Sequence, residues 1–303
     1  MSTIPEPYRH LVDDAAVFPP GSTPLAQALA EHRAHRGSGY ADLVGPFVVS
    51  DVALPDLIEA VRADEGPAPL RVSVVVTGGA GAVEPAVRWA ARAEELELAA
   101  VELALRDEQD LPRNARRVTT VVDQLRASGD LDDETPVYVE PPAVVEPEPG
   151  PSWLAALDEV AALDLRLKFR TGGVSTDAFP SATTLASYVE AALDRELRFK
   201  CTAGLHHAIR HRDEETGFEH HGFLNVLAAT RAALDGLGPA EVARRLDTTA
   251  AETVGGWLDE AGPEGLASAR RWFVSFGSCS VLEPLEDLVD LGVVDPAHLE
   301  GTP

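Results

Sequence analysis

The chain has 303 residues, of which 45% are hydrophobic and 25% charged, so it holds enough apolar material for a globular core. Its 50 Asp and Glu residues outnumber its 25 Lys and Arg residues and give a formal net charge of −25. Such a surface repels phosphate backbones and anionic lipids, which argues against nucleic acid and membranes as principal partners. With neither a basic or apolar leader nor a run of about 18 apolar residues, the sequence predicts a cytoplasmic protein.

Short, β-branched apolar runs alternate with longer stretches of helical period along the whole chain. In chain order, the predicted strands are Leu11–Phe18, Gly45–Ser50, Leu70–Thr77, Leu98–Leu105, Pro136–Glu140, Leu165–Arg170, Arg198–Thr202 and Trp272–Gly277. The predicted helices are Thr23–His35, Leu54–Asp64, Ala82–Glu95, Pro112–Ser128, Ser152–Leu163, Ser181–Leu193, Gly222–Leu234 and Leu282–Leu291. Eight strands, each followed by a helix, predict an α/β fold with a single-domain (β/α)8 TIM-type barrel over residues 1–303. An open, doubly wound parallel sheet is the alternative.

Three irregular segments interrupt this order. A proline-rich acidic loop at 141–152 follows the fifth predicted strand, and an extended, histidine-rich loop at 205–222 follows the seventh. Gly-Pro pairs at 238–239 and 262–263 indicate a helical insertion at 236–270, before the last strand.

The two lysines are the least ordinary feature of the composition. Lys168 and Lys200 are the only lysines among the 25 basic residues, and all the others are arginines. A GC-rich genome or adaptation to salt explains arginine as the generic cation. The two exceptions therefore indicate positions that need an amine, because lysine can lose its proton in a desolvated site and attack a carbonyl, whereas arginine stays charged. Survival of two lysines by chance is the alternative.

Polar residues gather at the carboxyl ends of the predicted strands, where barrels of this type carry their chemistry. Because side chains alternate along a strand, Lys168 and Lys200 both point into the barrel if Phe169 and Phe199 face the helices. Two amines on neighbouring strands then lie several ångströms apart and lower the pKa of one of them. We expect Glu102 and Glu140 to relay protons or to keep the second lysine charged. Simple charge neutralisation between lysines and glutamates is the alternative.

The segments around the lysines repeat one another and contain glycines just beyond the strand ends. They read Leu167-Lys168-Phe169-Arg170-Thr171-Gly172-Gly173 and Phe199-Lys200-Cys201-Thr202-Ala203-Gly204-Leu205, and Phe276-Gly277-Ser278-Cys279-Ser280 follows the last strand. Glycines at such positions let backbone N–H groups approach a phosphate or carboxylate. The predicted substrate-binding residues are Asp14, Arg170, Thr171, Gly172, Gly173, Thr202, Gly204, His207, Gly277 and Ser278.

These segments resemble the class I aldolases of the deoxyribose-phosphate aldolase type. The likeness rests on a Lys-x-x-Thr-Gly end to strand six, a Lys-x-x-Gly-Gly end to strand seven and a Gly-x-Ser-Ser turn after strand eight. It implies that Lys168 forms the Schiff base, that Lys200 lowers its pKa and that Glu102 takes the place of the acid on strand four. It also implies phosphate contacts from Gly172, Gly204, Gly277 and Ser278. This chain departs from the pattern with glutamate in place of aspartate, with Ala203 at the first position of the glycine pair, and with His206-His207 after it.

Five of the nine histidines fall in the loop at 205–222: His206, His207, His211, His220 and His221. His206 is the predicted acid/base group beside the imine. A metal site in the His206–His221 loop, with Glu140 or Asp14, and a purely structural loop are the alternatives. Cys201 and Cys279 are too few for a disulfide framework and lack a zinc-binding spacing, so we expect small apolar roles.

The sequence therefore predicts a cofactor-independent, Schiff-base-forming class I aldolase-like lyase. Its catalytic residues would be Lys168, Lys200, Glu102, Glu140 and His206, with no metal ligands. Its partner would be a small-molecule carbonyl substrate, an aldehyde, ketone or 2-oxo acid, with or without a phosphate. A homo-oligomer is compatible with this fold. The alternatives are a metal-dependent hydrolase or isomerase that uses the histidine loop, and a non-catalytic barrel that binds small anions.

Overall fold

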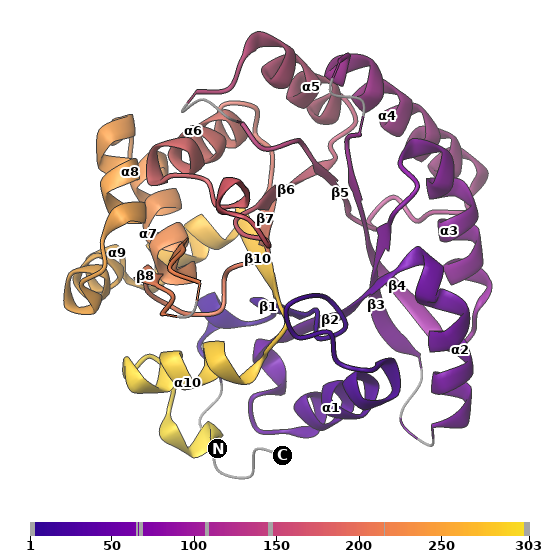
Figure 1. The fold of residues 1–303 in the computed structure, drawn as a ribbon, viewed down its shortest axis with the longest axis horizontal. Coiled ribbons are helices and arrows are strands. Elements are labelled where there is room, and N and C mark those ends of the chain that lie inside the picture. The colour runs from indigo at the N-terminus through magenta and orange to yellow at the C-terminus, as the bar shows by residue number, and fades with distance from the viewer. Residues whose placement is uncertain are drawn as a thin grey trace.

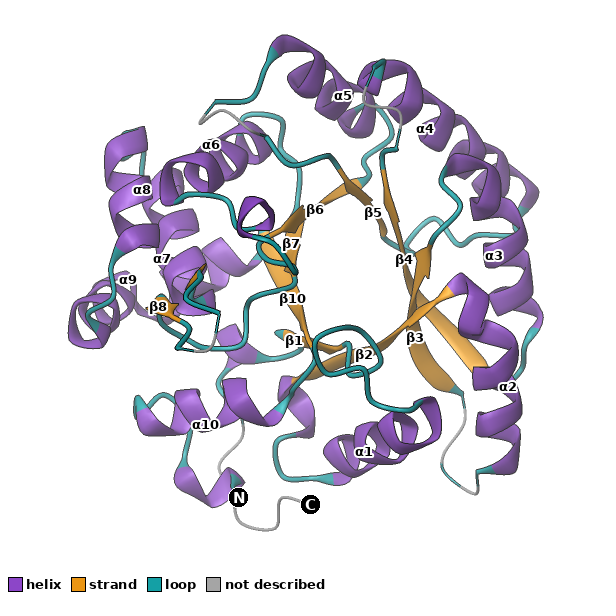
Figure 2. Ribbon diagram, in the orientation of Figure 1, coloured by secondary structure: helices purple, strands orange, loops and turns teal. Residues whose placement is uncertain are grey.

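Eight parallel strands close into a barrel in the computed structural model, with helices arranged around its outside (Figures 1 and 2). The structure describes residues 4–299 except for residues 65, 67–68, 107–108, 145–147 and 215. Around the barrel the strands follow the order β1-β10-β7-β6-β5-β4-β3-β2. The predicted (β/α)8 barrel is therefore confirmed, and the open sheet is wrong.

The barrel strands match the eight predicted segments in order. They are β1 (Val12–Asp14), β2 (Val44–Ser50), β3 (Leu70–Val76), β4 (Leu96–Ala104), β5 (Val137–Glu140), β6 (Arg166–Arg170), β7 (Phe199–Thr202) and β10 (Phe273–Ser278). A short antiparallel ribbon of β8 (His211–Arg212) and β9 (Glu219–His220) lies within the histidine-rich loop. The extension of the first strand to Phe18 is wrong, because the N–H of Phe18 bonds the carbonyl of Ala15 in a turn.

The helices likewise follow the predicted alternation. They are α1 (Leu25–Gly37), α2 (Leu54–Ala63), α3 (Ala80–Arg92), α4 (Leu111–Ser128), α5 (Pro151–Ala161), α6 (Ala182–Leu193), α7 (Phe223–Leu234), α8 (Pro239–Asp247), α9 (Ala251–Arg270) and α10 (Leu282–Asp290). The helix α6 begins where the hydroxyl of Ser181 accepts a bond from the N–H of Thr184, as expected of a side-chain cap. At Gly262, with a φ of 63°, the helical path of α9 is broken just before Pro263. None of the helices within the described ranges has the length and apolar character needed to cross a bilayer.

Alternation along β6 and β7 decides which side chains enter the barrel. The ring of Phe169 lies 5.2 Å from that of Tyr188 on α6 and 5.3 Å from that of Phe199. Phe199 in turn stacks on Phe273 of β10 at 5.6 Å. These rings form a buried layer between strands and helices, and the intervening positions on β6 and β7 are left to face the interior.

The loops that leave β6 and β7 are held against each other. The hydroxyl of Thr171 donates to the carbonyl of Ala203 at 2.6 Å, and the backbones of Gly172 and Gly204 lie in contact beside it. A Cβ atom on Gly172 would lie 2.8 Å from the Cα of Gly204. Gly204 also has a φ of 73°, which L side chains rarely adopt. Close packing of the two loops therefore accounts for both glycines.

We predict that Gly172→Ala lowers the free energy of unfolding by about 1–3 kcal/mol, because the new methyl group meets backbone atoms that have no rotamer to change. Gly81→Ala is the matched control: Gly81 lies in α3, with nothing within 4 Å of an added Cβ. There we expect no loss, or a gain of up to about 1 kcal/mol from helix propensity. Urea unfolding of both variants measures the difference, and equal stability would contradict the packing role of Gly172.

Candidate active site

The two lysines lie side by side inside the barrel. Lys168 on β6 pairs in register with Lys200 on β7, and their exposed fractions are only 3% and 1%. Both ammonium groups contact carboxylates carried by other strands of the barrel. The predicted placement of both lysines at one level of the interior is therefore confirmed.

One carboxylate joins the two lysines. The Oε1 atom of Glu102 on β4 lies 2.6 Å from the Nζ of Lys200, and its Oε2 atom lies 3.2 Å from the Nζ of Lys168. The hydroxyl of Ser73 on β3 donates a further bond of 2.6 Å to Oε1 of Glu102. A fully buried carboxylate thus has partners for both oxygens, which burial of a charge requires.

The network extends beyond Glu102 in both directions. On one side the Nζ of Lys200 lies 2.5 Å from Oδ2 of Asp13 on β1, and that oxygen also accepts a bond of 2.9 Å from Ser275 on β10. On the other side Glu140 on β5 contacts Lys168 at 2.9 Å and the Nε of Arg170 at 2.8 Å. We call this alternating series the charge chain; its members in order are Asp13, Lys200, Glu102, Lys168, Glu140 and Arg170.

Contacts within the charge chain keep Glu102, Lys200 and Glu140 ionised despite their burial. Burial alone would raise the pKa of Glu102, but Lys200 and Lys168 outweigh it and lower this pKa to about 2. Burial opposes the charge on Lys200, yet Asp13 and Glu102 raise the pKa of that lysine. The pKa of Glu140 is lowered despite its burial, since Lys168 and Arg170 lie against it. Lys200 is therefore an ammonium ion, and both glutamates are carboxylates near neutral pH.

Asp13 occupies the place that the sequence analysis assigned to Asp14. The Oδ2 of Asp14 lies 2.8 Å from Nδ1 of His32 on α1, and its Oδ1 accepts a bond from the N–H of Ala16. Asp14 therefore faces the helices, and its assignment to the substrate site has no support from these contacts. Val12 shares the face of Asp14, so the rule used for Phe169 and Phe199, with apolar residues outward, would have selected Asp13.

Several other predicted rim residues lie at the carboxyl ends of β6, β7 and β10 or directly after them. Thr202 pairs in register with Arg170 on one side and with Gly277 on the other. Ser278 is buried, and its hydroxyl accepts a bond from the N–H of Ser280. Gly173 packs close to Ala178, where a Cβ would lie 2.7 Å from the methyl group. Gly172, Gly173 and Gly204 thus have packing reasons that are independent of any phosphate, whereas a Cβ on Gly277 would meet nothing closer than 3.5 Å.

The clustered histidines bind to different neighbours. Nδ1 of His206 lies 2.9 Å from Glu283 on α10, and both ring nitrogens lie 3.8 Å from the sulfur of Cys279. Burial would lower the pKa of His206, but Cys279 and Glu283 raise it to about 10. His207 lies 3.2 Å from Asp287 on the same helix. Within the described ranges, no three His, Cys, Asp or Glu side chains converge as metal ligands would.

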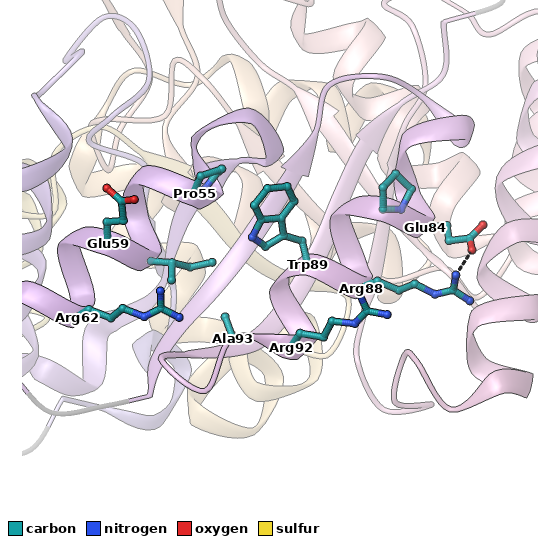
Figure 3. Close-up of a pocket in the computed structure, with 10 residues that line it drawn as sticks. Pro55, Glu59, Arg62, Glu84, Arg88, Trp89, Arg92 and Ala93 are labelled. Carbon is teal, nitrogen blue, oxygen red and sulfur yellow. Dashed lines mark ion pairs between the residues drawn. The ribbon is translucent and has the colours of Figure 1, made fainter.

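Two hollows on the surface lie outside the charge chain. A groove of about 670 Å³ runs between α2 and α3, beside the half-exposed Trp89 (Figure 3). Arginine and glutamate side chains border it, among them the ion pair of Arg88 with Glu84. A second hollow, of about 450 Å³, is lined by Gly79 and Arg106 among others. Neither includes a lysine or a member of the charge chain.

Comparison with known proteins adds no relative. No protein-family model, curated protein or solved structure matches this chain significantly. The function is therefore inferred from the geometry of the charge chain and from the short resemblance in sequence.

We predict that Glu102→Gln lowers the free energy of unfolding by about 3–5 kcal/mol, because it removes the shared partner of two buried lysines. The pKa of Glu102 is depressed in the folded protein, so its contribution is present above the unfolded value of 4.5 and disappears as the pH falls toward 2. The stability difference between wild type and variant should shrink over that range in urea unfolding. Glu97→Gln, which breaks an exposed pair with Arg71, should cost less than about 1 kcal/mol at every pH. A difference independent of pH would contradict the assignment.

Proposed function

We propose that the protein is a Schiff-base-forming, class I aldolase-like lyase that acts on a small aldehyde, ketone or 2-oxo acid. One observation carries this proposal. The only two lysines of the chain lie in register within the barrel and share Glu102. The short resemblance to class I aldolases of the deoxyribose-phosphate aldolase type supports the same chemistry.

Lys168 is the better nucleophile of the pair. Lys200 is held by Asp13 and Glu102 at 2.5 and 2.6 Å, whereas the carboxylates around Lys168 lie at 2.9 and 3.2 Å. Lys168 also shares its carboxylate neighbour with the half-exposed Arg170, toward the mouth of the barrel. We therefore assign imine formation to Lys168 and a permanent positive charge beside it to Lys200.

Glu140 supplies the proton transfers at Lys168. Glu140 takes a proton from the ammonium of Lys168, and the free amine attacks the substrate carbonyl carbon, while Glu102 stays ionised between the two lysines. Return of that proton to the carbinolamine oxygen releases water and leaves an iminium ion. In the cleavage direction, a base removes the proton of the β-hydroxyl group, an aldehyde departs, and the electrons of the broken C–C bond form an enamine. Protonation of the enamine and hydrolysis of the imine restore the amine.

The steps proposed here do not use His206. Its contacts are with Glu283 on α10 and with Cys279 just after β10, and within the described residues no contact joins it to either lysine. Its proposed acid/base role stays a prediction, as do the phosphate contacts implied for the rim glycines. The histidine contacts described above favour a structural role in joining the long loop to α10.

We predict that cyanoborohydride traps one carbonyl adduct per chain from a panel of aldehydes, ketones and 2-oxo acids, and that peptide mapping places it on Lys168. The mass increment identifies the carbonyl partner. Lys168→Arg should abolish the adduct, because a guanidinium does not form an imine under these conditions. Lys168→Met serves as a second variant, and circular dichroism confirms folding of both. Labelling of the N-terminal amine alone, or of neither lysine by any carbonyl, would refute the imine mechanism.

A further inference from the structure

The charge chain ends at the mouth of the barrel in an arginine. The side chain of Arg170 is 46% exposed, whereas those of Lys168 and Glu140 are 4% and 9% exposed. In the described part of the chain, its ion pair is made by Nε with Glu140. The terminal nitrogens therefore remain available for a second anion, in the fork geometry that suits a carboxylate.

Strand geometry places this guanidinium next to the proposed nucleophile. Lys168 and Arg170 are two residues apart on β6, so both point to the same side of the strand. The carboxylate of Glu140 bridges them, with Oε2 at 2.9 Å from Nζ of Lys168 and Oε1 at 2.8 Å from Nε of Arg170. One carboxylate group thus spans the space between the two cations.

The level of Arg170 leaves room for a small molecule. Its register neighbours around the barrel are Thr202 on β7 and then Gly277 on β10, both with small or absent side chains. A Cβ added to Gly277 would meet nothing closer than 3.5 Å. The protein carries a net charge of −25 and repels anions, so an anionic substrate needs a local cation at the entrance.

We propose that Arg170 binds the carboxylate of a 2-oxo acid substrate while the adjacent carbonyl carbon lies against Lys168. The inference rests on the proposed imine function and selects one of its three substrate classes. In a 2-oxo acid the carboxylate is bonded directly to the carbonyl carbon. The two groups are therefore as close as their proposed partners, Arg170 and Lys168, which a single carboxylate bridges. Neutral aldehydes and ketones leave the terminal nitrogens of Arg170 unused.

The test compares two carbonyl compounds that differ in one charge. Pyruvate and methyl pyruvate are trapped with cyanoborohydride across a concentration series, and the adduct at Lys168 is measured by intact mass and peptide mapping. In wild type we expect half-saturation by pyruvate at a concentration at least about tenfold lower than by methyl pyruvate, the size of one charge-assisted hydrogen bond. Arg170→Gln should remove this preference by weakening pyruvate about tenfold, with methyl pyruvate changed less than about threefold. Arg71→Gln, at the opposite end of a strand, should leave both unchanged.

If Arg170→Gln raised the half-saturating concentrations of pyruvate and methyl pyruvate equally, the inference would be overturned, because Arg170 would then act only through Glu140. A wild-type enzyme without preference for pyruvate would overturn it as well. Lactate separates this failure from failure of the imine mechanism, since it carries the carboxylate but no carbonyl group. Saturation-transfer NMR should detect lactate binding in wild type and its loss in Arg170→Gln. Lactate binding without any adduct at Lys168 would refute the imine and support the carboxylate site; adducts without lactate binding would do the reverse.

Discussion

Mutual neutralisation of buried charges is the constraint on which the interior of this barrel depends. Removing an ion from water costs several kcal/mol even after relaxation of the protein, unless partners compensate for it. In the charge chain every buried ammonium group lies between two carboxylates, and Glu102 and Glu140 each lie between two cations. The residues around the charge chain are those that this alternation of charges requires. Ser73 and Ser275 complete the hydrogen bonds of the carboxylates, and Gly45 lacks a Cβ where one would overlap the carboxylate of Asp13.

Such an interior is a poor choice if stability is the only requirement. Well-packed apolar side chains of similar volume are often as stabilising as a buried ion pair, or more so. This barrel has apolar layers available, since Phe169, Phe199 and Phe273 pack closely on its outer face. Charges from β1, β4, β5, β6 and β7 nevertheless converge at the level of the lysines. Convergence of ionisable groups from so many strands at one level is typical of a site that performs chemistry.

The sequence predicts the parts of this structure that depend on local pattern. Strand and helix periods are properties of neighbouring residues, so the eight strands and the register of Lys168 with Lys200 follow from them. Alternation along β1 also distinguishes its two consecutive aspartates, since Val12 and Asp14 share the outward face, but this rule was applied to β6 and β7 alone, and Asp13 was missed. Sequence context suggested that Gly172 and Gly204 bind a phosphate or carboxylate, because it cannot show that the two glycines contact each other. Tertiary partners such as Glu283 for His206 lie about eighty residues away, and no local pattern encodes them.

The positions of lysine and arginine within the charge chain help to decide whether the lysines are catalytic or only neutralise the glutamates. A permanent charge would serve equally well if Glu102 and Glu140 needed only to be neutralised, and this chain uses arginine at every other basic position. Arg170 shows that arginine is accepted within the same network, where the site opens to solvent. Lysine is retained at the two positions where the cation is buried and has a partner on each side. The amine therefore occurs where loss of a proton to an adjacent carboxylate is geometrically possible, and the guanidinium occurs where an incoming anion would first meet the protein.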